Sequence, residues 1–126
     1  MQIKDVMSPQ CEWIAPDATL EQAAQIMKNK DIGFLPVGEN DKLIGAITDR
    51  DIVIRAISAG ANPSSQVRDV MSPQVKYCFD DQAVDEICQN LSDIKMRRLP
   101  VVNRDKRLVG VVTLGNLSQA QAQQSG

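Results

Sequence analysis

Apolar residues recur with helical spacing at two places along the chain. The first set is Leu20, Ala23, Ala24 and Met27, and the second set, 64 residues later, is Val84, Ile87, Cys88 and Leu91. Positions i, i+3, i+4 and i+7 share one face of a helix, so each set predicts an amphipathic helix. Thr19 stands just before the first set with Gln22 three residues after it, which is the spacing of a capping box.

Short apolar runs follow each predicted helix. Residues 34–37 and 43–48 are separated by a polar turn containing Asn40 and Asp41, and residues 99–102 and 108–113 are separated in the same way. Two such runs joined by a short polar turn predict a β-hairpin. With a short extended segment near residues 12–14 and a last helix opening at Asp49 or Leu114, each half reads strand, helix, strand, strand, helix.

The two halves are copies of one unit. The hexapeptide DVMSPQ occupies residues 5–10 and again 69–74, and Leu-Pro-Val occupies 35–37 and 99–101 at the same offset of 64 residues. After a one-residue insertion, LIGAIT at 43–48 returns as LVGVVT at 108–113. The repeat predicts a first unit over 1–60, a linker over 61–66, a second unit over 67–120 and a flexible tail over 121–126.

Composition excludes several classes of partner. A net charge of −2 and a pI near 5.0 give no basic face, so we expect no nucleic-acid binding. No apolar run is long enough to span a membrane, and the opening MQIKDVMSP has no apolar signal segment. The sequence therefore predicts a cytoplasmic protein without a membrane partner.

Catalysis and metal binding are also disfavoured. The chain has no histidine, and its three cysteines show no metal-ligand spacing. There is no GxxxxGK[ST] loop and no arrangement that would activate a nucleophile. We therefore expect neither an enzyme nor a metal site, and no required cofactor.

The two junctions between strand and last helix allow two interpretations. In the first half the junction is Thr48-Asp49-Arg50-Asp51, and in the second it is Thr113-Leu114-Gly115-Asn116. Thr-x-x-Asp is close to a capping box, in which the side chains satisfy free amides of the helix. The same amides can bind a phosphate, and a carboxylate one turn away can accept hydrogen bonds from a ribose diol.

The paired DVMSP openings, the paired Leu-Pro-Val strands and the paired Gly-h-h-Thr-x-x-Asp/Asn junctions, where h is an apolar residue, resemble a tandem pair of cystathionine β-synthase (CBS) domains, a Bateman module. The likeness covers nearly the whole chain. It is strongest to the small stand-alone bacterial type, which includes the mycobacterial hypoxic response protein. The resemblance implies an α/β (α+β) fold of two βαββα units packed with pseudo-two-fold symmetry, two clefts between them and a disc-like homodimer.

Positions in the clefts follow from the resemblance. Cleft one would contain Thr48, Arg50 and Asp51 with Arg97 and Arg98; cleft two would contain Thr113, Gly115 and Asn116 with Gly33 and Phe34. Arginine recognises phosphate through paired hydrogen bonds, so cleft one is expected to bind and cleft two to be weak or empty. Arg97-Arg98 can equally be a solvated charge pair before an edge strand.

These observations predict a non-catalytic regulatory module that binds an adenosine-containing nucleotide, AMP, ADP or ATP, in the cleft between its units. NAD(H) and S-adenosylmethionine carry the same adenosine. The alternative is a structural or protein-interaction CBS pair with vestigial clefts, which acts through self-association or through an unidentified protein partner.

Overall fold

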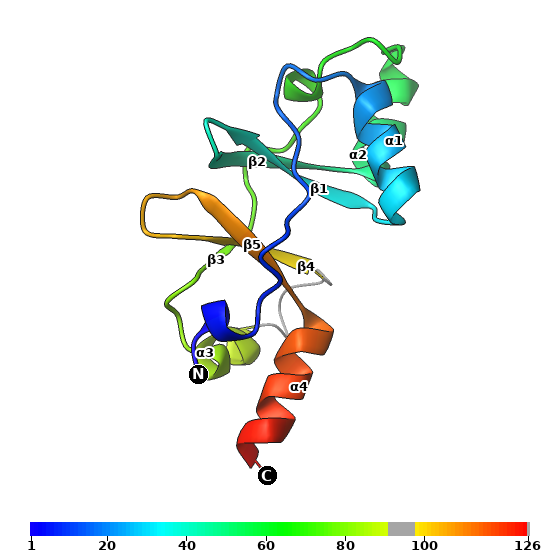
Figure 1. The fold of residues 1–126 in the computed structure, drawn as a ribbon. Helices are drawn as coiled ribbons and strands as arrows, with labels where there is room; N and C mark the ends of the chain where they lie inside the picture. The colour runs from blue at the N-terminus through cyan, green and yellow to red at the C-terminus, as the bar shows by residue number, and fades with distance from the viewer. Residues whose placement is uncertain (91–97, 126) are drawn as a thin grey trace. The chain divides into compact units, whose positions relative to one another are not determined.

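The computed structural model describes residues 1–90 and 98–125 and shows a mixed α/β architecture. Figure 1 shows the elements along the chain. The helices are α1 (Leu20–Lys30), α2 (Asp49–Asp51), α3 (Val84–Asn90) and α4 (Leu114–Ser125). The strands are β1 (Phe34–Glu39), β2 (Lys42–Thr48), β3 (Cys78–Phe79), β4 (Arg98–Val102) and β5 (Leu108–Thr113). Single 3-10 turns occupy Ile3–Asp5, Val67–Asp69 and Ile57–Ala59, and a π-helical turn spans Ile52–Ala56.

Both predicted hairpins are present. β1 pairs with β2 and β4 pairs with β5, each in antiparallel register with one bulge. β3 adds to β4 in parallel, whereas the equivalent segment of the first half is reduced to a single bridge between Ile14 and Val37. The inserted residue that changes the repeat offset lies in the hairpin loops: Asn40 and Asp41 form a turn with positive φ at both residues, while the longer loop before β5 has positive φ at Lys106.

Helix α1 begins as its sequence predicts. The Thr19 side chain accepts a hydrogen bond from the Gln22 amide at 3.1 Å, and the Gln22 side chain accepts one from the Thr19 amide at 2.9 Å. Leu20, Ala23 and Met27 are buried, which confirms the apolar face at these three positions, whereas the fourth predicted member, Ala24, is exposed. Leu91, the last member of the second predicted helical set, lies outside the described residues.

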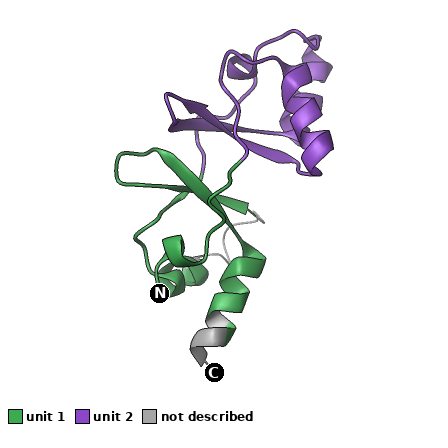
Figure 2. Cartoon of the chain, in the orientation of Figure 1, with its two compact units in different colours: residues 1–11, 76–126 green, residues 12–75 purple. Residues whose placement is uncertain are grey.

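The chain packs as two compact units that interleave the two halves of the sequence (Figure 2). Unit 1 consists of Met1–Cys11 and Lys76–Gly126, and unit 2 is the continuous stretch Glu12–Val75. Each DVMSPQ segment thus belongs to the unit formed mainly by the other half. The tail predicted over 121–126 continues as helix α4 to Ser125.

Each unit has a hydrophobic core of its own. The core of unit 2 includes Leu20, Leu35, Ile47 and Ala56 and is completed by Val67 and Val70, which precede β3. The core of unit 1 includes Val84, Leu99, Val112 and Leu117 and is completed by Ile3. Among the described residues, no helix has both the length and the apolar content needed to cross a membrane.

Unit 1 carries a surface cluster that unit 2 lacks. The Arg104 guanidinium lies 4.1 Å from the centre of the Phe79 ring and makes two hydrogen bonds to the Asp81 carboxylate, at 2.9 and 2.7 Å. Tyr77 packs edge-on against Phe79, and Lys106 lies 5.2 Å from the Tyr77 ring. These contacts tie the loop between β4 and β5 to β3.

The Asp81–Arg104 pair predicts a pH dependence of stability. The side-chain hydrogen bonds from Arg104 lower the pKa of Asp81 below its ordinary value of 3.8. A carboxyl with a lowered pKa in the folded state stabilises the fold above its unfolded pKa and loses that contribution as pH falls through the folded pKa. We expect Asp81→Asn to lower the melting temperature at pH 7. Below about pH 4 the melting temperature of this variant should decrease less than that of the wild-type chain. Differential scanning calorimetry across pH measures both.

Glu12 provides the matched control for this measurement. Its ion pair with Lys30 spans 3.4 Å between two exposed side chains. An ion pair between two exposed side chains contributes little, so Glu12→Gln should lower the melting temperature less than Asp81→Asn does. Equal effects of the two substitutions on the melting temperature would contradict a stabilising role for the Asp81–Arg104 pair.

Candidate functional site

The first junction is a complete capping box at the end of β2. The Thr48 hydroxyl oxygen accepts a hydrogen bond from the Asp51 amide at 3.0 Å, and the Asp51 carboxylate accepts one from the Thr48 amide at 3.0 Å. Both side chains are half-buried. This geometry confirms the capping interpretation. It occupies one oxygen of the Asp51 carboxylate, Oδ2; among the described residues, Oδ1 accepts no hydrogen bond.

The second junction repeats this geometry with an amide in place of the carboxylate. Thr113 accepts a hydrogen bond from the Asn116 amide at 3.1 Å, and the Asn116 side-chain oxygen accepts one from the Thr113 amide at 3.1 Å. Asn116 therefore caps helix α4 as Asp51 caps α2, but without charge. The two junctions have the same pattern of hydrogen bonds, but the capping side chain is charged in the first and neutral in the second.

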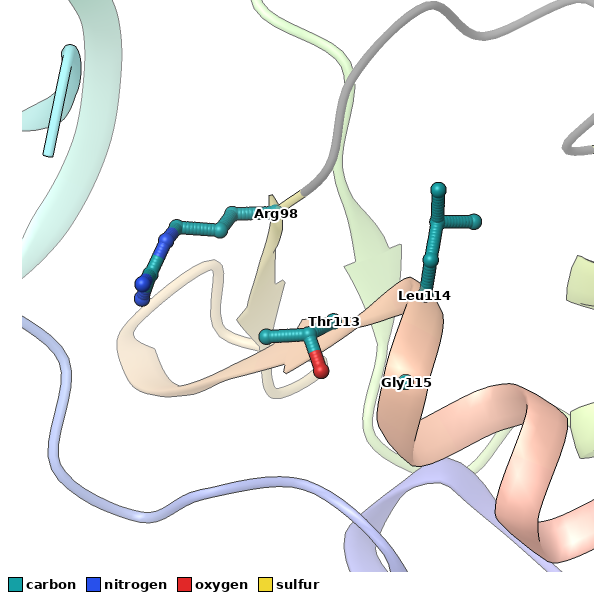
Figure 3. A pocket seen from close by; sticks show the side chains of 4 residues that line it. All are labelled: Arg98, Thr113, Leu114 and Gly115. Carbon is teal, nitrogen blue, oxygen red and sulfur yellow. The ribbon is translucent and has the colours of Figure 1, made fainter.

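A pocket of about 350 Å³ lies at the second junction, lined by Arg98, Thr113, Leu114 and Gly115. Arg98 and Thr113 are directly opposite each other across β4 and β5, so their side chains lie on the same face of the hairpin. Figure 3 shows these two side chains extending to one side, with Leu114 projecting away from them. The pocket contains an exposed guanidinium, a hydroxyl and the start of a helix.

The strand register gives four of the predicted cleft residues a neighbour within their own unit. Arg98 faces Thr113 as Phe34 faces Thr48. The predicted grouping of Arg98 with Thr48, and of Phe34 with Thr113, remains a prediction. Arg97 lies outside the described residues.

Gly33 and Arg50 lie beside the first junction. The Asp49 amide donates a hydrogen bond to the Gly33 carbonyl at 3.0 Å, and a Cβ at Gly33 would lie 2.8 Å from the Asp49 carboxylate. The Arg50 side chain is exposed. Asp49 and Leu114 were not among the predicted site residues, although both occupy the first helical position after the capping threonine.

The two junctions differ in the charged residues that they carry. The first carries two carboxylates, Asp49 and Asp51, beside one cation, Arg50. The second has no charged residue between Thr113 and Asn116 and has the Arg98 guanidinium across the hairpin. The start of a helix favours anions, and at the second junction no carboxylate occupies it. An anionic ligand group is therefore better matched by the pocket of unit 1.

Two copies of one unit, each with a capped strand-to-helix junction, match the CBS domain family over residues 3–57 and 67–123. The chain belongs to the CBS domain family. As a tandem CBS pair it is a regulatory module. It also aligns with 21% of the inosine-5′-monophosphate dehydrogenase of Methanocaldococcus jannaschii at 34% identity, a larger enzyme of which it resembles one part.

Hypoxic response protein 1 of Mycobacterium tuberculosis is 35% identical over 118 residues, covering 92% of this chain and 82% of that protein. The crystal structure of hypoxic response protein I matches with a TM-score of 0.82 at 32% identity, covering 95% and 98% of the two chains. The predicted likeness to this protein and the predicted fold class are thus confirmed. CBSX2 of Arabidopsis thaliana, in complex with AMP, matches with a TM-score of 0.81 at 27% identity, covering 99% and 98%.

The hypoxic response protein structure contains two coordinated zinc ions. The present chain has no histidine in its sequence. Within residues 1–90 and 98–125, no three His, Cys, Asp or Glu side chains gather as metal ligands would. Burial of Cys78, together with the charge of Asp80, raises the pKa of its thiol to about 12, which makes this cysteine a poor thiolate ligand.

The capping role of Asp51 can be tested by comparison with Asn116, the residue at the equivalent position of the second junction. Asp51→Ala removes the acceptor for the Thr48 amide and should lower the free energy of unfolding by about 0.5–2 kcal/mol. Asp51→Asn reproduces the chemistry of Asn116 and should retain most of that stability. Urea unfolding measures both, and an equal loss for the two variants would contradict the capping role.

Proposed function

We propose that this CBS pair regulates through an adenosine-containing nucleotide, AMP, ADP or ATP, whose phosphate binds at the pocket of unit 1. The observation that carries the proposal is the pairing of Arg98 with Thr113 at the start of α4. A guanidinium offers paired hydrogen bonds to phosphate oxygens, and helix amides add a favourable field. The site needs no catalytic group, in keeping with a sensor.

We further propose Asp51, at the first junction in unit 2, as a separate acceptor for ribose hydroxyls. Its Oδ2 is used by the cap, and Oδ1 is the remaining acceptor. A carboxylate oxygen that accepts from a hydroxyl makes a charge-assisted hydrogen bond, stronger than a neutral one. Relatives support adenosine as the recognised group: CBSX2 was solved with AMP, and the CBS pair of MJ0100 with 5′-methylthioadenosine and S-adenosyl-L-methionine, at a TM-score of 0.76 and 26% identity.

The phosphate assignment predicts a ligand-dependent effect of Arg98→Ala. Losing a hydrogen bond to a charged group costs about 1.5–3 kcal/mol, so affinity for AMP, ADP and ATP should fall by roughly ten- to a hundredfold. Affinity for adenosine, which has no phosphate, should change little. Isothermal titration calorimetry with the four ligands measures the difference.

Arg68→Ala is the matched control because Arg68 is exposed and lies outside both junctions. It should leave all four affinities unchanged. If the wild-type chain binds none of the four ligands, the nucleotide proposal is wrong. If Arg98→Ala weakens adenosine as much as ATP, the nucleotide binds with its phosphate elsewhere.

We also propose that the chain forms a homodimer through the segment after α2. Val53, Ile54 and Ile57 are 58%, 54% and 55% exposed within two turns of backbone. Neighbouring apolar side chains left in water mark an interaction surface more often than an ordinary one. The same surface supports the alternative function, a CBS pair that acts through a protein partner, if no nucleotide binds.

Ile54→Asp should weaken this association because a carboxylate at the centre of an apolar contact loses its hydration. Size-exclusion chromatography with light scattering should show a shift from dimer toward monomer, with the melting temperature of dilute samples nearly unchanged. Gln25→Asp, at an exposed position of α1, is the control. A monomeric wild-type chain at concentrations near 100 µM, roughly a hundred times a typical micromolar Kd, would contradict the homodimer.

A further inference from the structure

The two copies of DVMSPQ dock in the same manner on different units. We call residues 1–10 the first strap and residues 65–74 the second strap. Ser8 exchanges two backbone hydrogen bonds with Val111 of β5, at 2.8 and 2.9 Å. Ser72 exchanges the same two bonds with Ala46 of β2, also at 2.8 and 2.9 Å. Each strap therefore extends the hairpin of its unit at the outer strand.

Both straps are anchored by one buried aliphatic side chain. Ile3 of the first strap and Val67 of the second are 0% exposed. The Ile3 amide donates to the Gln82 carbonyl at 2.9 Å, and the Val67 amide donates to the Ala18 carbonyl at 2.8 Å. The anchors thus enter their cores beside the first turns of α3 and α1.

A glycine in each outer strand admits the strap. A Cβ at Gly110 would lie 2.4 Å from the Ser8 carbonyl oxygen and 2.8 Å from the Met7 sulfur. A Cβ at Gly45 would lie 2.6 Å from the Ser72 carbonyl oxygen. Any side chain at these glycines would displace the strap.

The acceptor on each unit recognises its strap by backbone pairing, an aliphatic anchor and the space above a glycine. None of these features requires that the strap come from the same molecule. The second strap is part of the continuous stretch that forms unit 2, whereas the first strap is separated from the rest of unit 1 by the whole of unit 2. The first strap is thus the one whose connection to its acceptor is long in sequence.

We propose that the first strap is exchangeable between copies of this chain, so that the unit 1 acceptor of one molecule binds residues 1–10 of a second molecule. The exchanged contacts are the same as those made within one chain, which is the condition for low-cost domain swapping. The unit 1 acceptor of one molecule then binds the first strap of a second copy as an added β-strand. This proposal is independent of nucleotide binding and uses a different surface from residues 53–57.

Within one chain the strap is tethered to its own acceptor, so docking within the chain competes with exchange. Exchange is therefore best detected when docking within each chain is disabled. Ile3→Asp disables the strap, because it would bury a carboxylate in the core of unit 1. Gly110→Ala disables the acceptor, because its methyl group would overlap the Ser8 carbonyl. Each variant retains the part that the other lacks.

The experiment follows the Val111 amide, which donates to the Ser8 carbonyl. Ile3→Asp chain labelled with nitrogen-15 is mixed with equimolar unlabelled Gly110→Ala chain, and amide hydrogen exchange is measured by NMR. The intact strap of the second chain should slow exchange at Val111 of the labelled chain by about tenfold or more. The control partner is the double variant Ile3→Asp/Gly110→Ala, which has no intact strap and should leave the rate unchanged.

Equal exchange rates with the two partners would overturn the proposal. If either single variant fails to fold, the wild-type chain decides the question with a fluorescent peptide of residues 1–10, added at millimolar concentration during a brief warming step. Retention of the peptide through gel filtration, and its loss when the Ser8 amide is N-methylated, supports exchange. Equal retention of the two peptides rejects it.

Discussion

The close approach of a strap to the outer strand of each hairpin is the constraint on which the structure depends. The serine carbonyl of each strap lies where the side chain of Gly45 or Gly110 would be. This approach allows the two backbone hydrogen bonds that cover part of β2 and β5, strands that would otherwise present unpaired edges. It also delivers Val67 and Ile3 to the two cores, so edge protection and core completion come from the same segment.

A symmetric backbone carries an asymmetric set of side chains. Both hairpins end at a threonine whose hydroxyl accepts a hydrogen bond from the amide three residues later, so the two helices start in the same way. The residues around these amides differ: Phe34 with Asp49 and Asp51 in unit 2, and Arg98 with Leu114 and Asn116 in unit 1. The fold thus provides two similar frames, and substitutions at a few positions give them different electrostatic character.

Much of this arrangement could be predicted from the sequence because it is local. Hydrophobic spacing predicted α1, Thr19 and Gln22 predicted its start, and apolar runs joined by polar turns predicted both hairpins. The Thr-x-x-Asp/Asn spacing offered capping as one of two interpretations of the junctions. The pairing of Arg98 with Thr113 was missed because cross-strand register depends on the bulge and on the length of the loop before β5. The assignment of each DVMSPQ segment to the opposite unit was missed because identical sequences contain no information about which acceptor each one reaches.

The interleaved connectivity has a consequence for the order in which the protein is assembled during synthesis. Unit 2 is one continuous stretch, so all of its parts are present once residue 75 has left the ribosome. Unit 1 needs β5 and α4 as well as Ile3, and β5 and α4 are translated after the whole of unit 2. The nascent chain therefore carries Ile3 and Met7 without their partners while the other unit is already complete. Residues 1–11 are thus translated before unit 2 but reach their final contacts only after unit 2 has all of its parts, the reverse of an order in which earlier segments fold first.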